Sequence, residues 1–448
     1  MANPRELALK ILIKSQDGMY SNLALNRFLT PEISAKDRAF VTELVYGVVK
    51  YRLRLDYIIS QFSKITPSRM DPNILHILRL GVYQMIFLDR VPDFAAVNES
   101  VEMAKKLEGK GAANFVNAVL RNIARRSREI LYPNREKEPE KYLSVFYSFP
   151  MWMVKRWVKL FGVDFTEELC GAFNERPKTC IRVNTLKIER EELESRFLDE
   201  GVNFQRGFYL DEALYLIDSP PLARLKSFKE GFFQPQDESS MIASIALGAK
   251  SGESVLDVAA APGGKTTHLA QMMKNAGSIT AWDIHPHRVE LVKEACRRLG
   301  VTIVDVEIKD ARIPDEKMFY RFDRVLIDAP CSGLGVIRRK PDIKWSKNPE
   351  DLAALKTEQA NILRICSKYV KPGGILLYST CSIEPEENQE VVEAFLRENG
   401  DFVFDDLRPC LPEKLRAAVD KHVGCLQLYP HIHKVDGFFI ARLRRLKA

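Results

Sequence analysis

The sequence contains no long hydrophobic run and no cysteine framework. Its longest apolar stretches, such as Met241 to Ala249, are well short of the ~20 residues that a membrane-spanning helix needs. Charged residues between Arg5 and Lys10 interrupt the hydrophobic segment that a secretory signal peptide would need. The eight cysteines include no Cys-x-x-Cys pair and no compact spacing, which excludes a secreted disulfide scaffold and predicts reduced thiols. These absences predict a soluble, cytoplasmic protein that does not contact a membrane.

Internal repeats and low-complexity tracts are also absent. The 448 residues, 46% of them hydrophobic and 28% charged, are enough for several buried cores, and the length suggests roughly three domains. The net charge is 67 − 60 = +7, and residues 1–140 hold 22 basic against 16 acidic side chains. This modest excess permits a polyanionic partner without requiring one.

Residues 1–135 predict an all-α domain, because apolar side chains recur there at steps of three and four residues. Examples are Leu7, Ile11 and Leu12; Phe40, Leu44, Val45 and Val48; and Ile74, Leu75, Leu78 and Val82. The last predicted helix also carries Arg121, Arg125 and Arg128 at helical spacing. This arginine stripe fits either a phosphate-binding face or an ordinary solvated face, and periodicity does not decide between them.

A charged, proline-flanked stretch at residues 134–141 predicts a linker. Residues 145–232 mix short helical and strand-like runs, which predicts a small α/β module. From residue 233 to 448, short apolar runs alternate with helical stretches, as in a Rossmann-like, doubly wound parallel sheet. The predicted strands are residues 255–258, 278–282, 302–306, 324–327 and 375–379.

A loop of small residues follows the first of these strands and precedes a helix. Such a loop brings the backbone close to a ligand at the helix N-terminus. Its residues are Ala259, Ala260, Ala261, Pro262, Gly263, Gly264 and Lys265. Gly264, Lys265 and Thr266 resemble the end of a nucleotide phosphate loop, but Ala259 replaces the opening glycine and Pro262 removes an amide from the cradle.

Acidic residues accompany four of the predicted strands. Asp257 lies in the first, Asp283 follows the second 26 residues later, Asp310 follows the third and Asp328 ends the fourth. The carboxyl ends of strands in an open α/β sheet are where ligands bind, and an acidic residue after the second strand can hold ribose hydroxyls. The pattern therefore favours a nucleoside-containing cofactor.

Two cysteines follow neighbouring strands of the predicted sheet. Cys331 comes after the fourth strand and Cys381 after the fifth, so both thiols are expected to open on the cofactor crevice. A thiolate that adds to carbon 6 of a pyrimidine makes carbon 5 nucleophilic enough to accept a methyl group. Asp328 is placed to hold the N3 and N4 edge of such a base.

Other reactive side chains predict no site. The remaining cysteines are expected to be small buried hydrophobes. They are Cys170, Cys180, Cys296, Cys366, Cys410 and Cys425. His422, Cys425, His431 and His433 do not have the spacing of a zinc site, so no metal is expected.

A basic run with one tryptophan follows the Cys331 loop. It consists of Arg338, Arg339, Lys340, Lys344 and Trp345. The run fits either a base-stacking loop beside the crevice or a solvated segment.

The motifs resemble those of a known family. Residues 260–267 (AAPGGKTT), 328–335 (DAPCSGLG) and 378–388 (YSTCSIEPEEN) are similar to the signatures of RNA cytosine-5 methyltransferases that use S-adenosylmethionine. Residues 38–48, 96–102 and 114–122 resemble a NusB-like RNA-binding helical domain. Together they resemble the bacterial Sun/Fmu-type (RsmB) enzymes, which methylate cytosine 967 of 16S rRNA, over nearly the whole chain.

This resemblance implies a role for each matching position. The loop Ala259–Lys265 would hold the cofactor, with Asp283 at the ribose and Asp310 near the adenine. Asp328 would lie beside the methionine end and the target base. Cys381 would be the attacking thiolate and Cys331 would assist release of the methylated base, an assignment that spacing alone does not make. The implied partner is small-subunit ribosomal RNA, bound by a monomer.

Two other function classes remain open on the residues alone. One is a nucleotide hydrolase that uses the imperfect phosphate loop, against which Ala259 and Pro262 argue. The other is a non-catalytic RNA-binding module, against which the intact cysteine pair argues.

Overall fold

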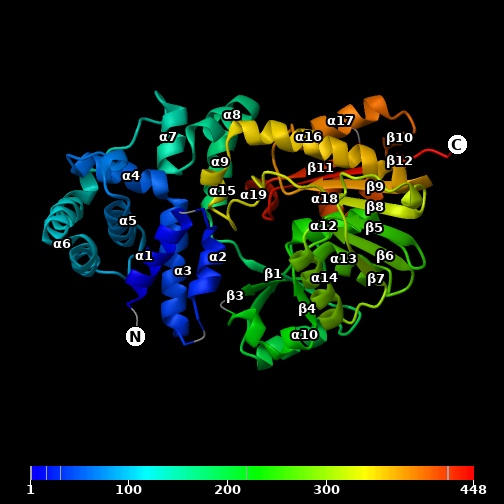
Figure 1. Ribbon diagram of the computed structural model, residues 1–448, viewed down its shortest axis with the longest axis horizontal. Coiled ribbons are helices and arrows are strands. Elements are labelled where there is room, and N and C mark those ends of the chain that lie inside the picture. Colours follow the sequence, from blue (N-terminus) through cyan, green and yellow to red (C-terminus); the bar gives the residue numbers. More distant parts are fainter. Residues whose placement is uncertain (1–2, 17, 31, 218, 421–422, 448) are drawn as a thin grey trace. The chain divides into compact units, whose positions relative to one another are not determined.

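The chain forms two compact units (Figure 1). The computed structural model describes residues 3–16, 18–30, 32–217, 219–420 and 423–447. The helical unit comprises Met1–Glu175 and Ile337–Ser346, and the sheet unit comprises Arg176–Val336 and Lys347–Ala448. Across the described ranges, no helix combines the length and apolarity needed to cross a membrane.

The helical unit contains α-helices with short connections. They are α1 (Pro4–Gln16), α2 (Ser21–Phe28), α3 (Ala35–Lys50), α4 (Arg52–Phe62), α5 (Pro72–Phe87), α6 (Asp93–Arg126), α7 (Pro139–Phe146), α8 (Met151–Phe161) and α9 (Val163–Asn174), with 3₁₀ turns η1 (Pro67–Arg69) and η2 (Ser127–Glu129). Helix α5 begins at Pro72 because Asp71 caps it, accepting from the backbone N–H groups of Asn73 and Ile74. Helix α6 is interrupted at Gly109, whose φ of 81° is not helical.

The apolar periodicity of the N-terminal region matches the buried side of these helices. Leu12, Val45, Leu78 and Leu120 belong to one core cluster formed by α1, α3, α5 and α6. The predicted all-α N-terminal bundle is therefore confirmed. Helices α7 to α9 belong to the same compact unit, although part of them falls within the predicted intermediate module.

The basic run after the Cys331 loop also belongs to the helical unit. The turn α15 (Ile343–Ser346) places Lys344 in a fully buried position, where its Nζ donates to the carbonyls of Lys50 and Ser148 and to Oδ1 of Asn174. The indole of Trp345 donates to the Val49 carbonyl at 2.8 Å. Lys344 and Trp345 thus pack within the helical unit. For these two residues, both predicted alternatives, a base-stacking loop and a solvated segment, are wrong.

The sheet unit begins with a small α/β module. Its sheet has the order β2 (Asn203–Arg206), β3 (Ala213–Ile217), β1 (Thr179–Val183) and β4 (Phe233–Pro235), with antiparallel neighbours. The module also contains α10 (Arg190–Asp199), η3 (Leu222–Arg224) and α11 (Lys226–Lys229). Cys180, Leu210 and Tyr215 share a core cluster with the larger sheet, so the module is packed against it.

The larger sheet has the order β10, β12, β9, β8, β5, β6, β7, with β11 paired to β12. Five strands run parallel: β5 (Ser254–Val258), β6 (Ser278–Asp283), β7 (Val304–Ile308), β8 (Phe322–Asp328) and β9 (Val370–Thr380). The strands β10 (Phe402–Phe404), β11 (Cys425–Leu428) and β12 (Phe438–Arg445) add an antiparallel part that the sequence analysis did not predict.

Helices cover both faces of this sheet (Figure 1). One face carries α12 (Glu238–Leu247), α13 (Gly264–Met272) and α14 (Pro286–Leu299), and the other carries α16 (Pro349–Cys366) and α17 (Gln389–Glu398). The remaining short elements are η4 (Glu316–Met318), η5 (Ser367–Tyr369), η6 (Arg408–Cys410), α18 (Glu413–Arg416) and α19 (Pro430–His433).

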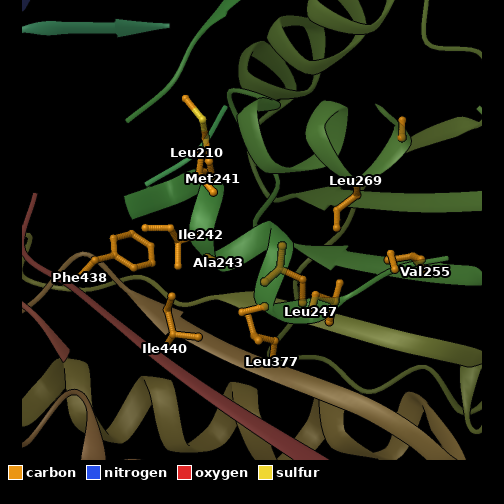
Figure 2. Packing of buried hydrophobic residues seen from close by; sticks show 14 of the residues in the cluster. Leu210, Met241, Ile242, Ala243, Leu247, Val255, Leu269, Leu377, Phe438 and Ile440 are labelled. Carbon is orange, nitrogen blue, oxygen red and sulfur yellow. The ribbon is translucent and has the colours of Figure 1, made fainter. Parts of the chain in front are cut away.

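Alternate residues of each strand enter the two cores. In β9, Leu377 packs on the side of α12, whereas Leu376 and Tyr378 pack on the side of α16. Figure 2 shows the first side, where Leu377 lies next to Leu247 and Ile440 lies closer to Ile242. Because both faces are buried, the strands read as continuous apolar runs. The predicted Rossmann-like domain is confirmed, with an added antiparallel edge.

Candidate active site

The site lies where the strand order reverses. From β5 the chain proceeds through β6 to β7 on one side, and β8 and β9 lie on the other, so the carboxyl ends of β5 and β8 border the crevice in which α/β folds bind ligands. A pocket of about 170 Å³ opens there. Its lining includes Gln234 to Asp237, Ser240, Asp257, Ala259 to Pro262, Gly264, Lys265 and Asp328. Most of the predicted loop and Asp328 therefore meet in one pocket.

Asp328 ends β8 and is held from two sides. Lys265 Nζ lies 2.7 Å from its Oδ2, and the Ser379 hydroxyl donates to its Oδ1 at 3.0 Å. Ser379 is opposite Asp328 in the β8–β9 pairing, which explains why the two side chains meet. These bonds orient the carboxylate and leave some of its lone pairs available to a ligand.

Asp257 lies deeper in the same pocket and is fully buried. Its Oδ2 accepts from the Thr266 hydroxyl at 2.6 Å, whereas its Oδ1 is buried with no hydrogen-bond partner among the described residues. Burial raises the pKa of this carboxyl to about 7, against the opposing effects of the Thr266 hydrogen bond and Lys265.

A buried arginine from the small module supports the cofactor loop. Arg182 in β1 donates to the Gly264 carbonyl at 2.8 Å, to Thr267 Oγ1 at 3.0 Å and to the side chains of Gln236 and Gln271. Burial lowers its pKa to about 9. Arg182 thus joins the module to the first turn of α13 and to a pocket wall.

The two predicted cysteines are adjacent. The sulfur atoms of Cys331 and Cys381 are 3.3 Å apart, and both side chains are half-buried. The loops that carry them also touch, since the Gly335 N–H donates to the Cys381 carbonyl at 2.9 Å. A Cβ at Gly335 would lie 2.1 Å from the Gly437 carbonyl oxygen, so this approach requires glycine. The hydrogen bond with Cys381, and then burial, raise the pKa of the Cys331 thiol.

A buried carboxylate joins the two cysteine loops. Oε1 of Glu387 accepts from the Ser332 N–H at 2.7 Å, and its Oε2 accepts from the hydroxyls of Ser332 and Ser382 at 2.5 Å each. Gln359 donates to Oε1 at 3.1 Å. Ser332 follows Cys331 and Ser382 follows Cys381, so Glu387 fixes the separation of the two loops.

Five predicted site residues do not line this pocket: Cys331 and Cys381, described above, and Gly263, Asp283 and Asp310. Gly263 precedes α13 and adopts a φ of 96°, which favours glycine. Asp283 ends β6, where its carboxylate accepts from the His285 N–H and lies 3.8 Å from Arg288. Asp310 follows β7 and is bound by Arg312 at 2.8 Å, which lowers its pKa. Both carboxylates lie at the carboxyl ends of neighbouring strands, as predicted.

The pocket fits the methionine end of a nucleoside cofactor. Small residues at 259–264 leave the backbone accessible at the start of α13, and the buried, unpartnered Oδ1 of Asp257 is an acceptor for an ammonium group. His422 lies outside the described residues. Among those the structure describes, no group of three His, Cys, Asp or Glu side chains could hold a metal ion.

Comparison with known proteins identifies the family. The family description "16S rRNA methyltransferase RsmB/F" matches residues 244–444, "NusB family" matches 2–125 and the ferredoxin-like domain of the RsmF/B-like methyltransferases matches 149–223. The chain is 43% identical to the probable ribosomal RNA small subunit methyltransferase B of Bacillus subtilis, over 98% of both chains. The chain belongs to the RsmB/F methyltransferase family.

Other relatives agree with this membership. Ribosomal RNA small subunit methyltransferase B of Shewanella oneidensis is 33% identical over 98% of this chain and 99% of its own. Among solved structures, PH0851 superposes with a TM-score of 0.81 at 30% identity, covering 99% of both chains. NSun6 from Pyrococcus horikoshii, solved with SFG, has a TM-score of 0.60 at 26% identity over 68% of this chain and all of its own.

Family membership confirms S-adenosylmethionine as the predicted cofactor and excludes the nucleotide hydrolase. Sequence reasoning missed Arg182, Gln236 and Glu387 as parts of the site. Arg182 carried one signal, because a charged residue interrupts an apolar strand-like run there. Glu387 stands in the third family motif, but no local pattern distinguishes it from its acidic neighbours.

Proposed function

We propose that this RsmB/F-family protein transfers a methyl group from S-adenosylmethionine to carbon 5 of a cytosine in 16S rRNA, by resemblance cytosine 967. The supporting observation is the pair of sulfur atoms of Cys331 and Cys381, which lie 3.3 Å apart after β8 and β9, where the charge of Asp328 acts on the Cys331 thiol. A thiol pair at neighbouring strand ends suits a reaction that both forms and breaks a bond to carbon 6 of the base.

Cys381 is the nucleophile in this proposal. Its thiolate adds to carbon 6, and the electron pair of the carbon 5–carbon 6 double bond makes carbon 5 nucleophilic. When bound, S-adenosylmethionine would supply an electrophilic methyl group to that carbon and would leave as S-adenosylhomocysteine. The proton on carbon 5 then leaves to a base and the Cys381 sulfur departs as thiolate, which restores the double bond.

Cys331 and Asp328 have supporting roles. The raised pKa of Cys331 keeps its proton in place, so Cys331 is the thiol that can donate to the Cys381 sulfur and assist release of the product. Asp328, oriented by Lys265 and Ser379, holds the N3 and N4 edge of the cytosine. The base must leave its stack to reach the pocket, at a cost of a few kcal/mol that is lower in a loop than in a duplex.

The test uses the full-length protein, unmethylated 16S rRNA and labelled S-adenosylmethionine. Cys381→Ser should abolish methyl transfer, since a neutral hydroxyl is a poor nucleophile at this carbon, while cofactor binding measured by calorimetry persists. Cys331→Ala should leave a protein–RNA adduct that survives denaturing electrophoresis. Bisulfite sequencing of the wild-type product locates the methylated nucleotide.

Cys410→Ala is the matched control, because Cys410 is also a half-buried cysteine of the sheet unit but is not part of the Cys331–Cys381 pair. It should retain activity and form no adduct. Methyl transfer by Cys381→Ser at the wild-type rate would exclude Cys381 as nucleophile, and turnover by Cys331→Ala without an adduct would exclude the release role.

A further inference from the structure

The helical unit contains a cavity that the proposed reaction does not use. Its volume is about 470 Å³, within the usual range of ligand sites. Four places in the chain supply its walls: α1 with residues 18–20, the α3–α4 junction, α5, and the inserted segment Ile337–Ser346, which contains α15. The lining residues are Leu12, Ser15, Gln16, Gly18, Met19, Tyr20, Val48, Val49, Arg52, His76, Arg79, Asp342, Trp345 and Ser346.

Arg52 supplies a cation to this cavity. Its side chain is exposed to solvent, and its pKa is lowered by partial burial and by the nearby Arg79 and raised by Asp56. Its guanidinium lies over the Trp345 ring, 5.4 Å from the centroid, and no described residue accepts a hydrogen bond from it. Its five N–H donors, which have no acceptor among the described residues, are suited to bind an anionic oxygen.

The neighbouring charged side chains Arg79 and Asp342 already have hydrogen-bond partners within the protein. Arg79 is held by both oxygens of Asp56 at 2.7 Å. The carboxylate of Asp342 accepts from the Ser21 N–H at 3.0 Å and from its hydroxyl at 2.5 Å. Among the described residues that line the cavity, Arg52 is therefore the arginine that forms no hydrogen bond with a carboxylate.

Two unpaired polar atoms accompany this cation. His76 is 6% exposed, and its Nε2 lies 2.8 Å from Gln16 Oε1, while its Nδ1 is buried with no partner among the described residues. Burial, with Arg79 and Arg52 nearby, lowers the pKa of His76 to about 3, so the ring is neutral and one nitrogen is an acceptor. The Ser15 hydroxyl is buried and unpartnered in the same part of the structure. Unsatisfied groups of this kind are costly unless a ligand pairs with them.

We propose that this cavity binds one nucleotide, with its phosphate on Arg52 and its base between the apolar wall and the His76 and Ser15 acceptors. Leu12, Val48 and Val49 provide that wall. A nucleotide combines the needed anion, flat apolar body and hydrogen-bonding edge. Its source is either an unpaired nucleotide of an RNA strand, which rests on the proposed function, or a free nucleotide, which does not.

Calorimetry on the full-length protein distinguishes these sources. Excess S-adenosylhomocysteine occupies the cofactor site, and cytidine monophosphate, adenosine monophosphate and a short single-stranded RNA are titrated in separate experiments. Arg52→Gln should weaken binding at least ~10-fold through loss of the charge-assisted contacts. Binding of the strand and the monophosphates assigns an RNA nucleotide, and binding of the monophosphates alone assigns a free nucleotide.

Arg69→Gln is the matched control, because Arg69 is exposed on η1 of the same unit and does not line the cavity. It should change monophosphate affinity less than ~2-fold. Ser15→Phe, which fills the cavity from α1, provides a second loss of binding that does not depend on charge. Absence of binding, or equal binding by wild type, Arg52→Gln and Ser15→Phe, would overturn the proposal. Methyl transfer is measured separately, so its failure alone would leave this result unaffected.

Discussion

Among single residues, Asp257 is held in a position that disfavours its charge. It is fully buried, one of its oxygens has no described partner, and its pKa is raised from the model-compound value of 3.8 to about 7. Sequence reasoning placed a carboxylate here but could not predict its protonation, because desolvation depends on which side chains close over β5. The unpartnered oxygen is consistent with a cofactor contact.

This raised pKa predicts a pH-dependent cost to stability. Between pH 4 and 7 the unfolded chain releases the Asp257 proton and the folded chain retains it, so stability falls as pH rises through this window. The slope from this group is at most about 1.4 kcal/mol per pH unit. Asp257→Asn removes that slope. The melting temperature of the variant, measured relative to wild type, should therefore rise between pH 4.5 and pH 7.5.

Asp305→Asn in β7 provides the control, since Asp305 is exposed. Its melting temperature relative to wild type should stay nearly constant over the same range. A constant difference between Asp257→Asn and wild type would show that Asp257 ionises normally in the folded protein.

Between elements, the geometry of the two thiols depends on Glu387. The loops after β8 and β9 meet through the hydroxyls of Ser332 and Ser382, which both donate to one buried carboxylate oxygen. Glu387→Gln replaces one carboxylate oxygen by an NH₂ group, which cannot accept a hydrogen bond. The hydrogen bonds that this oxygen accepts from the cysteine loops are therefore lost. The sulfur atoms would then lose their fixed separation.

We predict that Glu387→Gln lowers kcat by ~10- to 100-fold, because small displacements of reacting groups have effects of this size. The KM for RNA and the affinity for S-adenosylmethionine should change little, since Glu387 does not line the cofactor pocket. Steady-state kinetics gives kcat and KM, and calorimetry gives the cofactor affinity. A matched change, Glu390→Gln on the exposed side of α17, should be neutral. Parallel losses of kcat, cofactor affinity and thermal stability would instead indicate general unfolding.

Elements with local patterns were predictable from the sequence, and elements defined by distant contacts were not. The strands β5, β6, β8 and β9 were recognisable because burial on both faces gives continuous apolar runs. The convergence of Cys331 and Cys381 followed from the adjacency of consecutive strands in a doubly wound sheet. Lys344 gave no such signal, because its acceptors on Lys50, Ser148 and Asn174 are more than 150 residues away in sequence.

At the scale of the whole molecule, the inserted segment Ile337–Ser346 limits how RNA binding by the helical unit can be tested. Ser21, Val49 and Lys50 hold Asp342, Trp345 and Lys344, respectively. Deleting residues 1–130 would remove these partners and expose a segment that begins six residues after Cys331. A loss of RNA binding in that deletion would therefore be ambiguous. Surface substitutions are the cleaner test.

The arginine stripe, formed by Arg121 and Arg125 of α6 and Arg128 of η2, provides such substitutions. Arg121, Arg125 and Arg128 are exposed, and no described carboxylate forms an ion pair with them. If the stripe binds RNA phosphates, replacing all three with Gln should weaken affinity for 16S rRNA and reduce the slope of log affinity against log salt by about 2, at ~0.7 per phosphate. Affinity for S-adenosylmethionine should not change. Filter binding at several salt concentrations gives both quantities.

The control removes the same charge elsewhere on the helical unit, at the exposed residues Lys64, Arg69 and Arg90. General electrostatic attraction depends on net charge, so it would reduce affinity similarly in both triple variants. A phosphate-binding face depends on the position of its donors, so only the variant of the arginine stripe would lose the salt-dependent contacts. Equal slopes in the two variants would show that the stripe is a solvated surface opposite the core of the bundle.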